Sequence, residues 1–402
     1  MESAITATPP AAKKNAQSPQ FCGEKSISLL QKASGMAKYI YEYPNWPHFS
    51  WQDRVINAIF GEVRLMQGKI IGQMNSLGVL AKEEATLTAL TLDVVKSSEI
   101  EGESLNYDQV RSSIALRLGI NTAGLTPSNR YVEGVVEMTL DATQRYALPL
   151  TEKRLFGWHA ALFPIGYSGP YKIEVGGYRT GAMQVVSGAM GKEKVHYEAV
   201  KPEWVKEEMD KFLDWFNNDN SLDPVLKAAI AHFWFIIIHP FDDGNGRIGR
   251  AITDMLLARA EGSGERFYSM SSQILAERNR YYEILQKVQY SSGDITEWID
   301  WFLHCLKNAM LATEGATKNI LYKAEFWKRH EHTPINERQR LVLNRLFDGF
   351  EGKLQTSKWA KMTKTSNDTA LRDIKDLVEK GILQQTNEKG RNANYELVAY
   401  GL

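Results

Sequence analysis

The apolar residues of this chain recur mostly at intervals of three or four, which is the period of a helix that buries one face. This spacing predicts helices over residues 54–80, 83–100, 110–118, 130–140, 152–162, 203–216, 224–238, 276–290 and 295–310. The period changes around residues 171–187, where Val, Ile and Tyr lie between glycines, as is typical of strands. We therefore predict a mainly α fold with a small β-hairpin.

The two ends of the chain differ from this central part. Residues 1–25 are rich in Ala, Pro, Ser and Thr, which predicts a disordered tail. Residues 334–402 predict helices over 338–347, 356–362 and 367–379, followed by a hairpin with its turn at 387–392. This order resembles a winged helix, a small α+β domain. Its 12 Lys and Arg against 9 Asp and Glu give only +3, so DNA binding and protein contact stay open as alternatives.

The stretch from His239 to Arg250 separates two apolar helical patterns. Pro240, Gly244 and Gly246 break the helical period there, so a tight loop should join the two helices. A loop that leads into a helix start suits an anion, because the first N–H groups of the helix are unpaired and its dipole is positive at that end. The pattern therefore predicts a phosphate-binding loop.

Four side chains of this loop carry useful chemistry. His239 can take up a proton near neutral pH, and Asp243 offers hard oxygens to Mg²⁺. Arg247 and Arg250 lie three residues apart and share one helix face, where both can bind phosphate. Each residue alone has an ordinary explanation: a capping histidine, a turn aspartate or solvated arginines. Their combination favours a site that handles phosphate.

The same twelve residues resemble the signature of the Fic family, His-Pro-Phe-x-(Asp/Glu)-Gly-Asn-Gly-Arg-x-x-Arg. The resemblance implies a Fic-type helical core at residues 126–312. It also implies a protein adenylyltransferase that moves AMP from ATP to a Ser, Thr or Tyr hydroxyl of a protein, including itself. His239 is then the catalytic base and Asp243 the ligand of Mg²⁺. The nucleotide-binding residues implied within the signature are Asp243, Gly244, Asn245, Gly246, Arg247, Ile248, Gly249 and Arg250, with the side chain of Asn245 as a further donor.

A second short motif precedes the signature. Ser97 and Glu101 are four residues apart and share a helix face, and Gly102 suits a helix end. Alone, this reads as a solvated acidic helix terminus. It also resembles the family's inhibitory motif, (Ser/Thr)-x-x-x-Glu-(Gly/Asn). That resemblance implies that Glu101 pairs with Arg250 and competes with the γ-phosphate of ATP.

Two further sets of residues follow from the resemblance. Residues 177–180, 185–188 and 195–197 are similar to the family's flap hairpin, which can hold a target segment by strand addition. The remaining nucleotide-binding candidates are Val185, Val186, Ser187 and Gly188 in the flap, and Tyr281 and Gln289 where the family lines its adenine pocket. An ordinary hairpin and simple core packing are the alternatives.

Composition limits the setting. The 48 basic and 48 acidic residues balance, and the longest aliphatic and aromatic run, residues 233–238, is too short to span a bilayer. Two cysteines and no signal-peptide core lead us to expect a cytoplasmic protein without a membrane partner. We expect an N-terminal helical region at 26–125 and a linker helix at 313–333. The family resemblance also implies that the protein forms a homodimer.

Three alternative functions stay open at this point. The same fold can use another donor, namely UTP, GTP or CDP-choline. It can also remove AMP from a modified protein, with Glu101 aligning a water molecule. The last alternative is a non-enzymatic, nucleotide-sensing winged-helix regulator, although sensing alone does not need His239.

Overall fold

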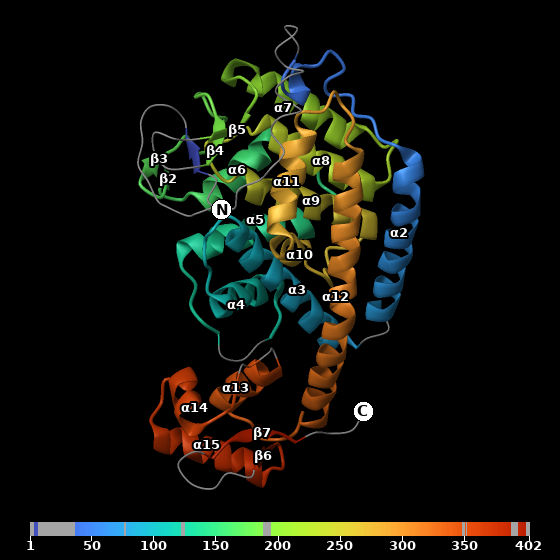
Figure 1. Ribbon diagram of the computed structural model, residues 1–402. Helices are drawn as coiled ribbons and strands as arrows, with labels where there is room; N and C mark the ends of the chain where they lie inside the picture. Colours follow the sequence, from blue (N-terminus) through green and yellow to red (C-terminus); the bar gives the residue numbers. More distant parts are fainter. Residues whose placement is uncertain are drawn as a thin grey trace.

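The computed structural model describes residues 4–6, 37–75, 78–121, 125–187, 194–347, 350, 352–386 and 393–398. The chain is mainly helical, as the apolar spacing predicts (Figure 1). Before the loop of residues 239–244 the structure contains the 3₁₀ helix η1 (Ile40–Glu42) and the helices α2 (Asp53–Asn75), α3 (Val79–Ile100), α4 (Tyr107–Leu118), α5 (Arg130–Gln144), α6 (Glu152–Leu162), α7 (Pro202–Asn218) and α8 (Pro224–Ile238). After it follow α9 (Asn245–Glu261), α10 (Met270–Ala276), α11 (Arg278–Val288) and α12 (Thr296–Arg329).

Helix α8 is the centre of the main core. Nearly all of its side chains are buried, so it is apolar on every face rather than amphipathic. Asp223 caps its start by accepting a hydrogen bond from the Val225 amide at 2.8 Å, and Pro224 stands in the first turn, where a proline costs no hydrogen bond. The buried apolar residues from Tyr39 to Met310 form one continuous cluster around it. Because α8 is fixed on all sides, the residue that follows its last turn is also fixed.

Short strands lie on one side of this helical core (Figure 1). β2 (Tyr167–Ser168) pairs with β3 (Tyr171–Lys172), and β4 (Gln184–Ser187) pairs antiparallel with β5 (Lys194–Glu198). β1 (Ala4–Thr6) adds to the other edge of β4, so this sheet has the order β1-β4-β5. We predicted that residues 1–25 form a disordered tail, but residues 4–6 of this range form a strand. They pair there because the edge of β4 that faces away from β5 offers unpaired backbone groups. The rest of that tail lies outside the described residues.

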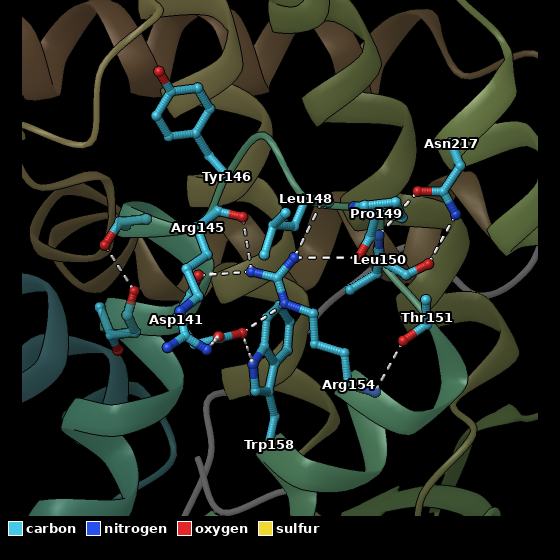
Figure 2. Close-up of polar contacts among 12 residues, drawn as sticks. Asp141, Arg145, Tyr146, Leu148, Pro149, Leu150, Thr151, Arg154, Trp158 and Asn217 are labelled. Carbon is cyan, nitrogen blue, oxygen red and sulfur yellow. Dashed lines mark hydrogen bonds and ion pairs between the residues drawn. The ribbon is translucent and has the colours of Figure 1, made fainter.

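The loop between α5 and α6 is tied down by a polar network around one arginine (Figure 2). Arg154 Nε donates to Asp141 Oδ2 at 2.6 Å, and the remaining guanidinium nitrogens donate to backbone carbonyls at the end of α5 and in the loop. Trp158 Nε1 donates to the same Asp141 oxygen at 2.7 Å. Asn217 adds two hydrogen bonds to the backbone of Leu150, at 2.9 and 2.8 Å. These contacts fix the position of α6, whose C-terminal end packs against Gly244 in the loop between α8 and α9.

The C-terminal unit has its own core. It contains α13 (Glu337–Phe347), α14 (Thr356–Thr363), α15 (Asn367–Glu379) and the hairpin of β6 (Leu383–Gln385) with β7 (Tyr395–Leu397). The predicted order of elements is therefore present, whereas the predicted turn at 387–392 lies outside the described residues. A second cluster of buried side chains, which includes Phe326 and Trp359, is separate from the main core. The winged-helix resemblance stays a prediction.

Some boundaries differ from the predictions. Helix α12 runs unbroken from the main core to Arg329, so the expected linker helix is the last part of a longer one. The helix predicted over 276–290 corresponds to α11, which begins after Glu277, whose backbone lies outside the helical region, whereas α10 before it was not predicted. Strand pairing stops at Lys172, although the pattern suggested a longer strand. No helix in the described ranges is both long and apolar enough to cross a membrane.

Candidate active site

The loop between α8 and α9 is shaped by two residues with positive φ. His239 ends α8 in the left-handed region at φ 52°, and Gly244 precedes α9 at φ 80°. A Cβ at Gly244 would lie 2.9 Å from the Phe163 ring, so both the conformation and the space favour glycine. Asn245 closes the loop, because its Oδ1 accepts from the Phe241 amide at 3.0 Å and its Nδ2 donates to the Phe241 carbonyl at 2.8 Å.

This bridge bears on one prediction. The side chain of Asn245, which we expected to be a phosphate donor, is 1% exposed, and its Oδ1 and one N–H of Nδ2 bind Phe241. The tight turn between the two helices leaves backbone groups inside the loop, and this amide satisfies them. The backbone N–H groups and the charged side chains of the loop are therefore its main groups for a ligand.

His239 is held in one tautomer. Its Nδ1 lies 3.1 Å from the Ile236 carbonyl, which can only accept, so Nδ1 carries the proton. Its Nε2 is buried and has no hydrogen-bond partner in the described part of the chain. Burial lowers the pKa of the imidazole to about 4, so the ring is neutral at physiological pH. A neutral ring with its lone pair on Nε2 has the form that a general base needs.

Arg250 contacts the end of α3, far away in the sequence. It is 3% exposed, and its Nη2 donates to Glu101 Oε1 at 2.8 Å and to the Ser97 carbonyl at 2.9 Å. Its Nε donates to Ser97 Oγ at 2.8 Å. The predicted meeting of Glu101 with Arg250 is confirmed by this geometry. Nη1 of Arg250 is buried without a partner among the described residues, so the guanidinium keeps a donor for a ligand.

Glu101 also covers the first turn of α9. A Cβ built on Gly246 would lie 2.1 Å from Glu101 Oε1 and 3.2 Å from Arg250 Nη1. The carboxylate therefore stands at the helix N-terminus, the position that an anion prefers. Gly102, which follows it at φ 86°, allows the chain to turn away from α3.

Arg247 has a carboxylate partner that the sequence patterns did not indicate. Its Nη1 donates to Glu103 Oε2 at 2.6 Å and to the Tyr131 hydroxyl at 2.6 Å, and its guanidinium lies 5.1 Å from the centre of the Phe163 ring. Arg247 is 1% exposed, and its Nε is buried without a partner in the described ranges. Only the acidic character of the segment that contains Glu103 hinted at this pair.

Asp243 is partly exposed within the loop. Its Oδ1 accepts from the Gly244 amide at 2.6 Å, and Ser168 Oγ donates to its Oδ2. No group of three or more His, Cys, Asp or Glu side chains gathers to hold a metal among the described residues. A single carboxylate still fits Mg²⁺, which keeps several waters and usually takes one or two carboxylates together with substrate phosphates.

The segment before β4, part of the predicted flap, is anchored directly to the loop between α8 and α9. The side chain of Arg179, 2% exposed, donates from Nε to the His239 carbonyl at 2.7 Å and from Nη2 to the Val200 carbonyl. Its backbone amide donates to the Pro240 carbonyl at 2.9 Å. Residues 177–180 therefore form this anchor, and they precede the hairpin of β4 and β5. Tyr197 adds a bond from its hydroxyl to the Ile237 carbonyl at 2.5 Å.

The other predicted nucleotide-binding residues that the structure describes lie in the flap hairpin or in the helical core. Residues 185–187 lie in β4, and Gly188 lies outside the described residues. Tyr281 is 2% exposed and binds His232 Nε2 through its hydroxyl at 2.9 Å, and Gln289 is 5% exposed. Tyr281 packs against Trp298 and Trp301. This is a core position, which was the alternative, so the geometry gives the adenine-pocket expectation no support. Ile248 is 0% exposed in α9, where it is also a core residue.

The chain is similar to known proteins over the region that contains this site. Residues 149–257 match the Fic/DOC family, and residues 39–120 match a domain of unknown function, DUF4172. The Drosophila willistoni protein adenylyltransferase Fic is 28% identical over 253 residues, which cover 62% of this chain and 46% of the relative. The Caenorhabditis elegans protein adenylyltransferase fic-1 is 39% identical over 66 residues, 16% of this chain and 13% of that protein. The chain thus spans less than half the length of these curated relatives.

A solved structure shares the fold. The crystal structure of a Fic family protein from Desulfovibrio desulfuricans superposes with a TM-score of 0.50 at 20% sequence identity. The alignment covers 89% of this chain and 100% of that chain. This likeness supports the arrangement of the helices and carries no statement about a ligand.

Proposed function

We propose that this chain, which contains a Fic/DOC-family domain, is a protein adenylyltransferase: it moves AMP from ATP to a Ser, Thr or Tyr hydroxyl of a protein. The two curated relatives above carry that activity in their names. The observation that carries the proposal is His239, with Nδ1–H bound to a carbonyl and Nε2 free, beside a helix N-terminus and two buried arginines. A base next to an anion site is what attack of a hydroxyl on a phosphate ester needs.

In the proposed reaction the target hydroxyl gives its proton to Nε2 of His239 while its oxygen attacks the α-phosphorus of ATP. A P–O bond to the target forms, the bond between the α-phosphorus and the bridging oxygen breaks, and pyrophosphate leaves. The enzyme forms no covalent intermediate. The backbone N–H groups of Gly244, Asn245 and Gly246 bind phosphate oxygens, while Arg247 and Arg250 bind the distal phosphates.

Asp243 is the residue that would hold Mg²⁺ in this proposal. It is partly exposed within the loop, and Ser168 and the Gly244 amide orient its carboxylate. When bound, the cation supplies charge neutralisation to the phosphates.

Glu101 inhibits the enzyme in this proposal. A guanidinium has a fixed set of donors, so Arg250 cannot bind Glu101 and a γ-phosphate in the same way at the same time. Glu101 also covers Gly246 in the first turn of α9, where a phosphate would approach the backbone. Withdrawal of Glu101 frees both positions. The flap is the proposed holder of the target segment, because Arg179 ties it to the carbonyl of His239.

The test uses purified protein, Mg²⁺ and ATP labelled at the α-phosphate, with and without cell lysate as a source of targets. Three forms are compared: wild type, Glu101→Gly, and Glu101→Gly combined with His239→Ala. We expect weak labelling of protein by the wild type, strong labelling by the single variant and none by the double variant. A silent Glu101→Gly variant that is folded would contradict AMP transfer. Labelling that persists without His239 would contradict its role as the base.

A further inference from the structure

The turn after α3 presents two carboxylates to the two arginines of the loop. Glu101 binds Arg250 at 2.8 Å, and Glu103 binds Arg247 at 2.6 Å. Both arginines are almost completely buried, with 3% and 1% of their side chains exposed. Within the described residues, each guanidinium also keeps a buried nitrogen without a partner. The second pair is therefore built like the first.

We propose that Glu103 is a second inhibitory carboxylate, which occupies Arg247 in place of the β-phosphate of a nucleotide, as Glu101 occupies Arg250 in place of the γ-phosphate. This inference rests on the proposed function for the order of the phosphates along α9. Arg247 lies about one turn closer than Arg250 to the N-terminus of α9, which follows the loop that contains His239, so we place it at the phosphate nearer the reacting centre.

The contacts show why another anion can replace Glu103 while Arg247 stays in place. The Glu103 side chain is 39% exposed, whereas Arg247 is enclosed by the Phe163 ring and the Tyr131 hydroxyl. Tyr131 accepts from Arg247 and donates to Glu103. When Glu103 leaves, Tyr131 still holds the guanidinium in place. Arg247 is thereby ready for another anion without a change of position.

The local charges also favour exchange. Burial raises the pKa of Glu103, and the neighbouring charges of Asp243 and Glu101 add to this, while Arg247 opposes it. Three carboxylates therefore share a site with two arginines. A nucleotide that carries its phosphates together with a cation would replace two of these carboxylates and relieve their mutual repulsion.

The two carboxylates are fixed to the same short piece of backbone. The amides of Glu101 and Glu103 both donate to the Ser98 carbonyl, at 3.1 and 3.0 Å, and Gly102 between them donates to Glu99 at 3.0 Å. Any movement of the end of α3 therefore moves both carboxylates together. We infer that one displacement clears both arginines, so that inhibition is released as a unit.

The affinities for ADP and ATP distinguish the Glu103–Arg247 contact from the Glu101–Arg250 contact, because ADP has a β-phosphate but no γ-phosphate. Binding of each nucleotide with Mg²⁺ is measured by isothermal titration calorimetry in a His239→Ala background, which removes the proposed base and so prevents turnover. Glu101→Gln, Glu103→Gln and their combination are compared with Glu99→Gln. Glu99 is the matched control, because it is a glutamate of the same helix end that is exposed and pairs only with Lys96 among the ion pairs described.

We expect Glu103→Gln to tighten both ADP and ATP by about tenfold, the scale of one hydrogen-bonded charge pair. Glu101→Gln should tighten ATP much more than ADP, and Glu99→Gln should change neither. Unchanged or weaker ADP binding by Glu103→Gln overturns the inference, since Glu103 would then only support Arg247. Glu103→Ala serves as the second variant if Glu103→Gln does not fold. Tighter ADP binding without AMP transfer by Glu101→Gly would leave this inference standing and refute the proposed activity.

Discussion

Gly134 in α5 lies directly against the backbone of α6, and its replacement tests how tightly the site depends on that contact. A Cβ added at Gly134 would lie 1.8 Å from the carbonyl oxygen of Ala161 and 2.7 Å from its carbonyl carbon. Both atoms belong to the backbone of α6, so no side chain can rotate away to make room. The Gly134→Ala variant must therefore move one helix away from the other.

The cost follows from two opposing terms. Forcing an extra methyl into a packed contact costs about 1–3 kcal/mol, and a clash with backbone belongs at the upper end. Alanine in place of glycine inside a helix returns about 1 kcal/mol. We expect Gly134→Ala to lower the free energy of unfolding by about 2 kcal/mol.

Gly157 in α6 offers a matched control. It is also a helical glycine, but its added Cβ would meet no atom within 4 Å. Gly157→Ala should therefore stabilise the protein by about 1 kcal/mol through helix propensity alone. The two variants introduce the same methyl group into neighbouring helices, and they should differ by about 3 kcal/mol with opposite signs.

Urea unfolding followed by far-UV circular dichroism measures both variants against the wild type. The reasoning is refuted if Gly134→Ala is as stable as the wild type, because the two helices would then have room to spare. The contact also matters for the site, since Tyr131 precedes Gly134 on α5 and Phe163 follows Ala161 at the end of α6. We expect Gly134→Ala to weaken nucleotide binding in addition to stability, and Gly157→Ala to leave nucleotide binding unchanged.

Other predictions follow from individual groups. Burial lowers the pKa of His239 to about 4, so AMP transfer by Glu101→Gly should be flat above about pH 5 and should fall as the pH drops through about 4, measured with α-labelled ATP. Arg154→Met removes the centre of the network in Figure 2 and should cost about 3 kcal/mol in urea unfolding, whereas Arg145→Met, whose side chain is 70% exposed, should change stability by less than about 0.5 kcal/mol. Burial and nearby acids raise the pKa of Asp254 to about 8, so the folded state keeps a proton that the unfolded state loses near pH 4. This contribution to stability is present in full below about pH 4 and is lost as the pH rises towards 8; a wild-type urea midpoint that does not fall more than that of Asp254→Asn over this range would contradict it.

Much of the local structure could be predicted from the sequence. The helices at 152–162, 224–238 and 367–379 begin and end where the apolar spacing and the capping residues indicate. Helix formation depends on neighbours within one or two turns, so the information is local. The short helix α10 escaped prediction because its start is stabilised from elsewhere: Asp93 in α3 accepts hydrogen bonds from Ser269 and from the Ser271 amide.

Some residues of the candidate site could likewise be predicted from the sequence, and others could not. His239, Asp243 and the two arginines lie within twelve residues, so the sequence alone placed them in one loop and indicated their chemistry. The pair of Glu101 with Arg250 came from the family resemblance, because 149 residues separate the two partners. No pattern predicted that Glu103 and Tyr131 would enclose Arg247, at separations of 144 and 116 residues.

Tertiary structure decided the remaining features because they depend on where distant helices pack. The tautomer of His239 is set by the carbonyl of Ile236 at the end of a buried helix, and its low pKa is set by the burial that this packing produces. Arg179 could be recognised only once the flap lay against the loop. The sequence by itself determined which residues can do the chemistry. The packing of α3, α5 and α9 determined which of their charges are paired, because a charge finds its partner only where the helices bring the two side chains together.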